Sequence, residues 1–252
     1  MDKEKVDQLK KILKGANSRD PKTVREEAKE FLGSINANEL VMAEQAIMNE
    51  GVKPEEMGRL CAAHLEMMED NIQGIKEKLP EDHPIQTLVL EHEEILKFLD
   101  ELESLNKKMQ EAKKFTDLSI ADYEKLQHIG HHLEAAEKHH KREEDVLFPA
   151  IEAHGVFGPP QMMVEEHKDL RALKKGLNSL ASGPRDDFGK YQRDLNEIAG
   201  ELVQYLRDHI FKENNILYPT ALDVLPKDEW TKIKEDADKI GYCCFTPKYL
   251  KK

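Results

Sequence analysis

The sequence predicts an all-α protein in which a small helical domain precedes an up-down four-helix bundle. Charged residues make up 35% of the 252 residues and aromatic residues only 6%, while Gly and Pro are sparse, at 13 and 11. A chain rich in Glu, Lys, Leu and Ala favours helices over sheets. After residue 80, long amphipathic segments follow one another through short connections. This pattern is typical of antiparallel helices in a bundle.

The first segment, residues 1–78, is expected to form a compact domain of short helices. In "VDQLKKIL" the apolar residues share one helical face. "NANELVMAEQAIMNEG" begins with Asn caps and ends at Gly51, and the next run has Pro54 in its first turn. "KLPEDHP" then marks the boundary of this domain.

Four long helices are expected in the second segment, residues 79–224. They cover approximately residues 84–114, 120–153, 161–180 and 188–217. The second helix should kink or end near Pro149, and the fourth should end before Pro219. A last helix around "KDEWTKIKEDADKI" and a tail form the third segment, residues 225–252.

The net charge and the cysteine content argue against several classes of protein. A net charge of -12 argues against a nucleic-acid partner, because phosphates would be repelled. The N-terminus is polar, and no apolar run approaches the length that spans a membrane. Three cysteines, Cys61, Cys243 and Cys244, cannot form a disulfide framework. We therefore expect a cytoplasmic protein that contacts neither nucleic acid nor membrane, with Cys243 and Cys244 as reduced thiols.

One motif occurs twice. "HHKREEDVLFPAI" at 139–151 and "HIFKENNILYPTA" at 209–221 share a His, a Glu four residues later, and then Leu, an aromatic residue and Pro. The similarity extends upstream, since "VLEHEEILKFL" contains His92 and "VEEHKDLRALKKGL" contains His167. The bundle therefore reads as two copies of one helical hairpin.

The spacing within the motif predicts a metal site. Residues four apart lie on the same face of a helix, so each His and its Glu can offer a nitrogen and an oxygen to the same point. Apolar neighbours on that face predict that both side chains point into the bundle. Two buried carboxylates are costly without a counter-charge, which a pair of divalent metals would supply. Imidazole and carboxylate suit iron, zinc or manganese. Surface ion pairs are the alternative, but two copies in register disfavour them.

The segments "LEHEEI", "HHKREEDVLFP", "EEHKDLR" and "HIFKENNILYP" resemble the hemerythrin-like, or HHE cation-binding, family over about residues 80–222. The resemblance implies two non-haem Fe ions in the bundle, with Mn or Zn as alternatives. It implies carboxylate bridges from the two Glu residues and the ligands His92, His139, Glu143, His167, His209 and Glu213. "EQAIMNEGVKPEEMGRLCAAHLEMM" resembles a helical domain of unknown function that commonly precedes hemerythrin-like domains.

The chain departs from the family at one ligand. Erythrocyte-type hemerythrins have a second His one turn before the third-helix ligand, where this chain has Met163. His132 and His128 lie seven and eleven residues before His139, roughly on its face, and either could replace the missing His or simply stack in the layer above the site.

The first motif also allows a second pairing. His140 and Glu144 have the same spacing as His139 and Glu143. Counting back from the prolines that end the two motifs favours His139 and Glu143, so Glu144 is the less certain ligand.

By resemblance, such a centre binds oxygen or nitric oxide for sensing or stress response. The alternative is a di-iron enzyme that reduces nitric oxide or peroxide, or an iron donor for iron–sulfur cluster repair. Metal storage or a structural metal is a third interpretation. No kinase or cyclase signature is present, so the N-terminal domain is expected to act on a separate protein partner. Whether the protein is an enzyme stays open at this point.

Overall fold

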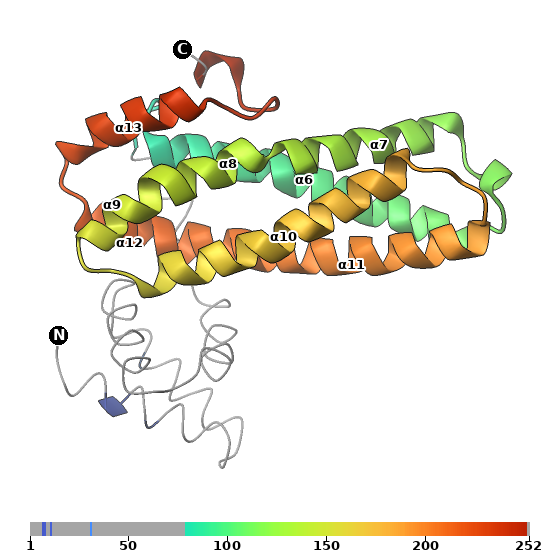
Figure 1. Cartoon of the computed structure of the whole chain (residues 1–252), viewed down its shortest axis with the longest axis horizontal. Coiled ribbons are helices and arrows are strands. Elements are labelled where there is room, and N and C mark those ends of the chain that lie inside the picture. The colour runs from blue at the N-terminus through green and yellow to red at the C-terminus, as the bar shows by residue number, and fades with distance from the viewer. Residues whose placement is uncertain (1–6, 9–10, 12–30, 32–78, 251–252) are drawn as a thin grey trace. The chain divides into compact units, whose positions relative to one another are not determined.

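The computed structural model describes residues 7–8, 11, 31 and 79–250 of the chain. Apart from residues 7–8, 11 and 31, the expected N-terminal domain, with Cys61, therefore lies outside the described residues. Every regular element from 79 to 250 is helical (Figure 1). None of the helices in this part of the chain is both long and apolar enough to cross a membrane.

Eight α-helices, two short 3₁₀ turns and two π-helical turns follow one another from residue 84. In order they are α6 (Pro84–Glu111), η1 (Phe115–Asp117), α7 (Ile120–Ala135), α8 (Glu137–Arg142), η2 (Glu143–Leu147), α9 (Phe148–Ala153), α10 (Gly158–Ser182), α11 (Phe188–Lys212), η3 (Glu213–Leu217), α12 (Tyr218–Val224), α13 (Glu229–Ile240) and η4 (Lys248–Leu250). The turns η2 and η3 are the π-helical ones.

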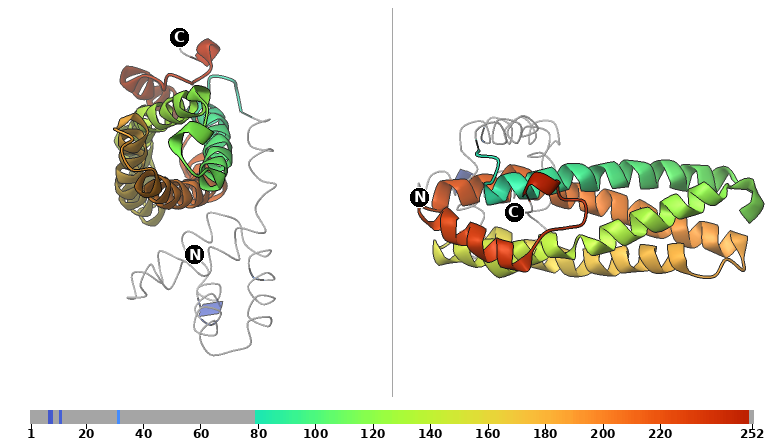
Figure 2. Two further views of the ribbon diagram at one scale, coloured as in Figure 1. Left: turned by 90° about the vertical axis from the view of Figure 1, so that its right-hand side faces the viewer. Right: turned by 90° about the horizontal axis from the view of Figure 1, so that it is seen from above.

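The chain divides into two compact units. Among the residues described between 79 and 250, one unit comprises residues 80–148, 163–210 and 227–250, and the other includes 149–162 and 211–226. In the first unit, α6, α7 with α8, α10 and α11 lie lengthwise beside one another and form a ring seen end-on (Figures 1 and 2). The up-down four-helix bundle is thus confirmed. The domain boundaries expected at 78 and 224 stay predictions.

Local sequence explains where the first two bundle helices begin. The Nδ1 of His83 accepts a hydrogen bond from the backbone N–H of Ile85 at 3.2 Å, and Pro84 occupies the first turn of α6. At the start of α7, Ser119 and Asp122 form a reciprocal capping box. These caps satisfy backbone donors that a helix cannot satisfy itself.

The second bundle helix is interrupted earlier than Pro149. Between α7 and α8, Ala136 has φ −66° and ψ 3°, which departs from α-helical geometry. Before Pro149 the helix changes to the wide turn η2 and then continues as α9 to Ala153. The segment is therefore bent by local changes in its hydrogen bonding.

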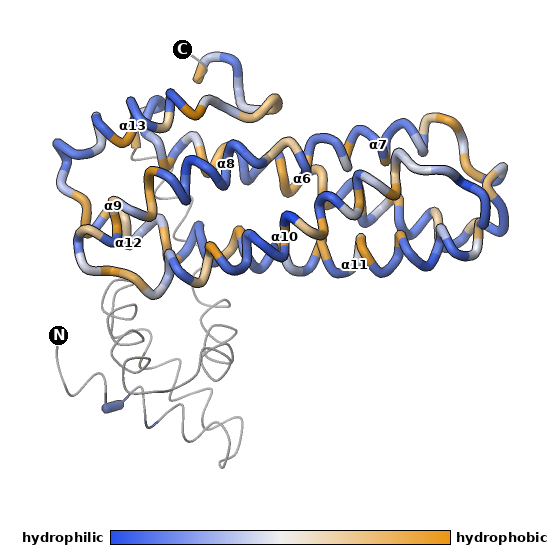
Figure 3. Tube along the Cα trace, viewed as in Figure 1, coloured by the Kyte–Doolittle hydropathy of each residue, from blue (hydrophilic) through white to orange (hydrophobic). Residues whose placement is uncertain are grey.

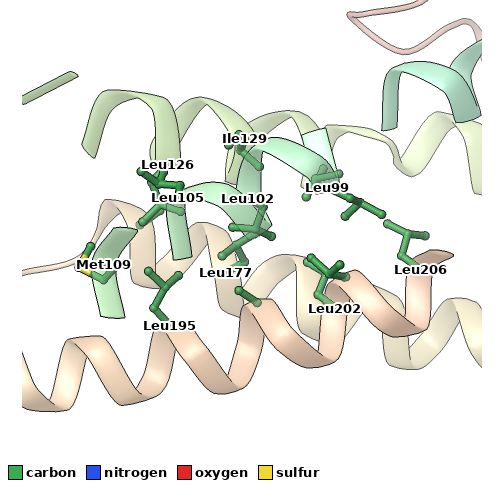
Figure 4. Close-up of a cluster of buried hydrophobic side chains, with 14 of the residues drawn as sticks. Leu99, Leu102, Leu105, Met109, Leu126, Ile129, Leu177, Leu195, Leu202 and Leu206 are labelled. Atoms are coloured by element: carbon green, nitrogen blue, oxygen red, sulfur yellow. The ribbon is translucent and has the colours of Figure 1, made fainter. Parts of the chain in front are cut away.

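An apolar core fills one part of the bundle. It draws leucines from all four helices, including Leu102, Leu126, Leu177 and Leu195, each no more than 1% exposed (Figure 4). Hydrophobic and hydrophilic positions alternate along each bundle helix (Figure 3), as burial of one face requires. Along the chain, Leu102 follows His92 and Leu177 follows His167, whereas Leu126 precedes His139 and Leu195 precedes His209. The antiparallel helices thus leave their other end to the polar residues.

Candidate metal centre

The six expected ligand residues are all buried, with no more than 1% of their surface exposed. Each lies on a helix or begins a π-helical turn: His92 on α6, His139 on α8, Glu143 in η2, His167 on α10, His209 on α11 and Glu213 in η3. Burying an imidazole or carboxylate costs free energy unless hydrogen bonds or counter-charges compensate. The hydrogen bonds and charges around these six side chains therefore indicate whether they could bind a metal.

Both His-x-x-x-Glu motifs end in a π-helical turn. The turn η2 begins at Glu143 and η3 begins at Glu213. Each is closed by the residue before a Pro, because the backbone N–H of Phe148 donates to Glu143 and that of Tyr218 donates to Glu213. Single π-helical turns are frequent at functional sites. The repeat therefore includes backbone geometry as well as side chains.

One cluster of ligand atoms includes both motif carboxylates. One ligand atom from each member lies within 4.8 Å of the others, and the members are His92, His139, Glu143 and Glu213. The His139 Nε2 is 3.5 Å from Glu143 Oε2. The buried carboxylates of Glu143 and Glu213, with one oxygen of each within 4.8 Å of the other, repel each other when both are ionised, and a bound cation would offset this repulsion.

A second cluster consists of three histidines, His140, His167 and His209, again with one ligand atom each within 4.8 Å. The Nε2 atoms of His167 and His209 are 3.0 Å apart. The ring of His140 stacks on that of His167, with centroids 3.8 Å apart and planes 4° apart. Because Glu143 Oε2 is also 3.6 Å from His167 Nε2, Glu143 reaches both clusters and suits a bridging role.

Three further carboxylates pair with the Nδ1 atoms of histidines in the two clusters. Each pairs with one Nδ1: Glu91 with His139 at 2.8 Å, Glu144 with His167 at 2.7 Å, and Glu166 with His209 at 2.8 Å. A carboxylate accepts the Nδ1–H proton, so in the neutral imidazole the Nε2 carries the lone pair. This carboxylate–histidine arrangement orients histidines that bind metals.

The donor set fits a transition metal. Two Nε2 lone pairs that face each other at 3.0 Å repel unless a proton or a cation lies between them. Imidazole nitrogens with carboxylate oxygens are donors that suit iron, zinc and manganese. Histidine and carboxylate side chains that project inward from the helices of a bundle are also the usual way such folds build two-metal sites.

Glu91 is the most strongly held of the outer carboxylates. Arg142 and the hydroxyl of Thr246 also donate hydrogen bonds to it. Burial would raise the pKa of Glu91, but the hydrogen bond from His139 and the charge of Arg142 outweigh burial and lower it to about 2. The guanidinium of Arg142 in turn lies 5.0 Å from the ring centroid of Tyr242. The C-terminal tail therefore takes part in holding His139.

Glu144, which the sequence offers as a less certain ligand, belongs to neither cluster. Its two oxygens are occupied by His167 and by Arg171, at 2.7 and 2.9 Å. Burial raises its pKa, but these two hydrogen bonds dominate and lower the pKa to about 2. The carboxylate thus stays ionised at neutral pH and positions His167 from outside the cluster.

His132 does not lie in either cluster. Its Nδ1 is 2.9 Å from Cys244 Sγ, and its ring stacks on Phe98. The expected position assumed one regular helix from His132 to His139. The break at Ala136 changes the rotation between them, so the seven-residue spacing does not place His132 on the same face.

His140 is the third histidine of the cluster that contains His167 and His209. The side chain of Met163 is buried, while His140 joins the cluster from α8. Lys174 Nζ lies 3.4 Å from His140 Nε2. Burial and the charge of Lys174 lower the pKa of His140 well below its usual value, which favours the neutral imidazole.

No role was predicted for Glu91 and Glu166 from the sequence, although a repeated pattern in the sequence contains both. Each directly precedes a predicted first-helix ligand, His92 or His167. Each nevertheless binds the second-helix histidine of its own hairpin, at 2.8 Å in both cases. The repeated Glu-His pair is thus part of the same duplicated unit.

Comparison with known proteins agrees with the motifs. Residues 83–221 match the family model of the hemerythrin HHE cation-binding domain, which is more than half of the chain. Residues 8–74 match the model of a family of unknown function, DUF438. Both resemblances inferred from the sequence are thereby confirmed.

Curated relatives match part of the bundle. The chain is 34% identical over 95 residues to the iron-sulfur cluster repair protein YtfE of Musicola paradisiaca strain Ech703, covering 36% of this chain and 43% of the relative. It is 33% identical over 96 residues to the protein of that name from Escherichia coli O157:H7, covering 35% and 43%. The chain thus spans less than half the length of these relatives.

Proposed function

The chain belongs to the hemerythrin HHE cation-binding family, and on that basis we propose that its bundle holds two iron ions. His92 and His139 would hold one ion, and His167 and His209 the other. Glu143 and Glu213 would bridge the pair. The iron would supply redox chemistry and a coordination position for a small diatomic ligand.

The arrangement of His167 and His209 carries this proposal. Their Nε2 atoms lie 3.0 Å apart, while Glu144 and Glu166 accept hydrogen bonds from their Nδ1 atoms. When both Nδ1 atoms carry the proton, the two Nε2 lone pairs face each other, and a cation bound between them would remove their repulsion. Outer carboxylates also raise the basicity of the inner nitrogens, which strengthens metal binding.

We propose that this centre binds oxygen or nitric oxide in sensing or in a stress response. His140, neutral and stacked on His167, keeps this part of the site rich in imidazole. In this role the N-terminal segment, residues 1–78, would pass the signal to a separate protein partner.

The relatives favour a second candidate function. Both relatives described above carry the name iron-sulfur cluster repair protein. In a repair function the iron would be cargo delivered to a damaged cluster, and the N-terminal segment would dock the recipient. The same residues would then bind iron for release.

Iron content after purification without oxygen tests the shared basis of both candidates. About two irons per chain are expected in the wild-type protein, and His209→Ala should lower this content because the paired nitrogen is removed. A wild-type protein loaded with zinc alone, or a variant with unchanged iron content, contradicts the proposal.

Two assays on the iron-loaded protein then separate the candidates. A spectrum of bound oxygen or nitric oxide that reverses when the gas is removed supports ligand binding. Transfer of iron to a cluster-depleted iron–sulfur protein, measured by the return of that protein's visible absorption, supports repair. Turnover of nitric oxide or peroxide with a reductant would instead favour an enzyme.

A further inference from the structure

We propose that Cys244, His132 and His128 form a second metal site at the surface of the bundle unit, for a thiophilic divalent ion such as Zn²⁺. This site shares no ligand with the buried clusters. It goes beyond the function proposed above and does not depend on it.

Cys244 and His132 are brought together by the fold. They are 112 residues apart in the chain, yet Cys244 Sγ lies 2.9 Å from His132 Nδ1. The ring of His132 stacks on Phe98, with centroids 5.2 Å apart and planes 4° apart. This stacking fixes the ring so that Nδ1 faces the thiol.

The backbone on either side of Cys244 is anchored. Its neighbour Cys243 is 1% exposed, and Thr246 is 2% exposed and bonded to Glu91. The backbone N–H of Thr246 donates to the carbonyl of Cys243 at 3.2 Å and closes a turn around Cys244. The Cys244 side chain is nevertheless exposed. An accessible thiol on a fixed backbone loses little conformational entropy when it binds a ligand.

Phe245 strengthens the attachment of this turn. Its ring centroid lies 5.6 Å from that of Phe98 and 6.2 Å from that of His132. The same aromatic group therefore holds both the thiol-bearing turn and the imidazole. The two ligands are positioned by one shared contact.

His128 supplies the third ligand. It lies one turn before His132 on α7, and their ring centroids are 4.1 Å apart. Between residues 79 and 250, the groups of three or more ligand atoms that already converge are the two buried clusters. The exposed ring of His128 must therefore rotate toward Cys244 to complete the site, and such rotation is easy at the surface.

The ligand types select the ion. A thiolate with imidazoles favours zinc and copper(I) over hard cations such as magnesium and calcium. Three protein ligands leave a fourth position for solvent, as in zinc sites that exchange or react rather than purely structural ones. Binding converts the Cys244 thiol to a thiolate and releases its proton to solvent.

Cys243 cannot take the place of Cys244. Cys243 is 1% exposed, whereas Cys244 is exposed. The surface site therefore has a single thiolate ligand. An absorption that arises from a metal–thiolate bond at this site is therefore expected to depend on Cys244 alone.

Titration of the iron-loaded protein with Co²⁺, without oxygen, tests the site. Co²⁺ is the probe because a cobalt–thiolate bond gives a charge-transfer absorption in the near ultraviolet. We expect this absorption to saturate at one Co²⁺ per chain and to be absent in Cys244→Ser. His132→Ala and His128→Ala should each weaken Co²⁺ binding at least about tenfold, because losing a direct ligand costs at least as much as losing a group that only orients one.

Matched variants separate this site from other cysteines and histidines. Cys61→Ser, Cys243→Ala and His154→Ala should keep the absorption. Iron content and helical circular dichroism in Cys244→Ser should equal those of the wild type, which shows that the buried centre and the fold are intact. No absorption in the wild-type protein, or an absorption that persists in Cys244→Ser, overturns the proposal.

Discussion

Thr246 in the C-terminal tail donates a hydrogen bond to Glu91, the carboxylate that holds the Nδ1 of His139. The three groups form a buried chain that runs from the tail to a predicted metal ligand. Helix α13, which precedes the tail, packs against α6, α8 and η2. A segment outside the four bundle helices thus helps to orient a histidine inside them.

Loss of the Thr246 hydroxyl should therefore weaken metal binding. Thr246→Val keeps the shape of the side chain but removes its hydrogen bond to Glu91. We expect iron(II) affinity to fall about tenfold, within the range for groups that orient a metal ligand. Competition with a coloured iron(II) chelator measures this affinity. Thr231→Val, at an exposed position of α13, is the control and should bind iron as the wild type does.

Glu213→Gln should have opposite effects on the iron-free and iron-loaded proteins. Without iron, removing one of two neighbouring buried negative charges relieves repulsion, so the midpoint of thermal unfolding should rise or stay equal. With iron, the wild type should gain about 2.7 kcal/mol at a free iron concentration 100 times its Kd, and the variant should gain much less. Calorimetry of both forms measures these changes. An equal gain from iron in the two proteins would remove Glu213 from the ligand set.

The buried His and Glu pairs were predictable from the sequence because a short helical spacing determines which residues share a face. His139 with Glu143, and His209 with Glu213, needed only the four-residue period and the repeat. The hydrogen-bond partner of Glu91 could not be predicted from helical spacing. Its neighbour in the chain is His92, but its hydrogen bond goes to His139, 48 residues away, and only the helix packing decides that choice.

Departures from regular helix geometry explain the other differences. Spacing placed His132 near His139, but a single residue with ψ 3° at Ala136 interrupts the helix between them. The π-helical turns at Glu143 and Glu213 have no residue signature of their own, beyond a Pro shortly after each. Local dihedral changes of this kind depend on tertiary packing, which a periodic pattern does not contain.

A close approach of two bundle helices gives a prediction about stability. A Cβ added at Gly130 of α7 would lie 3.0 Å from the Cα of Asn178 on α10. Because backbone cannot move aside as a flexible side chain can, Gly130→Ala should destabilise the bundle by about 1–3 kcal/mol. Gly200 on α11 has no atom within 4 Å of such a Cβ.

Gly200→Ala is therefore the matched control for Gly130→Ala. It should stabilise the protein by about 0.5–1 kcal/mol, because alanine loses less backbone entropy in a helix. Urea unfolding followed by circular dichroism measures both variants. If Gly130→Ala proved as stable as the wild type, α7 and α10 would have to be farther apart than described.

Asp122 makes part of the stability depend on pH. Hydrogen bonds from Lys108 and Ser119 lower its pKa to about 2, from an ordinary value of 3.8. A group with a lowered pKa in the folded state stabilises the fold above its unfolded pKa and loses this contribution as pH falls through the folded pKa. The contribution of Asp122 should therefore be complete above about pH 5 and vanish between about pH 4 and pH 2.

Asp122→Asn measures that contribution directly. The Lys108 partner is 53% exposed, so solvent screening should limit the difference from the wild type to about 1 kcal/mol at pH 7. The free energy of unfolding in urea, taken at several pH values, should show the two proteins converging as the pH falls toward 2. Asp186→Asn, at an exposed position before α11, should track the wild type throughout. A difference between Asp122→Asn and the wild type that stays constant down to pH 2 would mean that the cap at Ser119 acts through shape and not through the charge of Asp122.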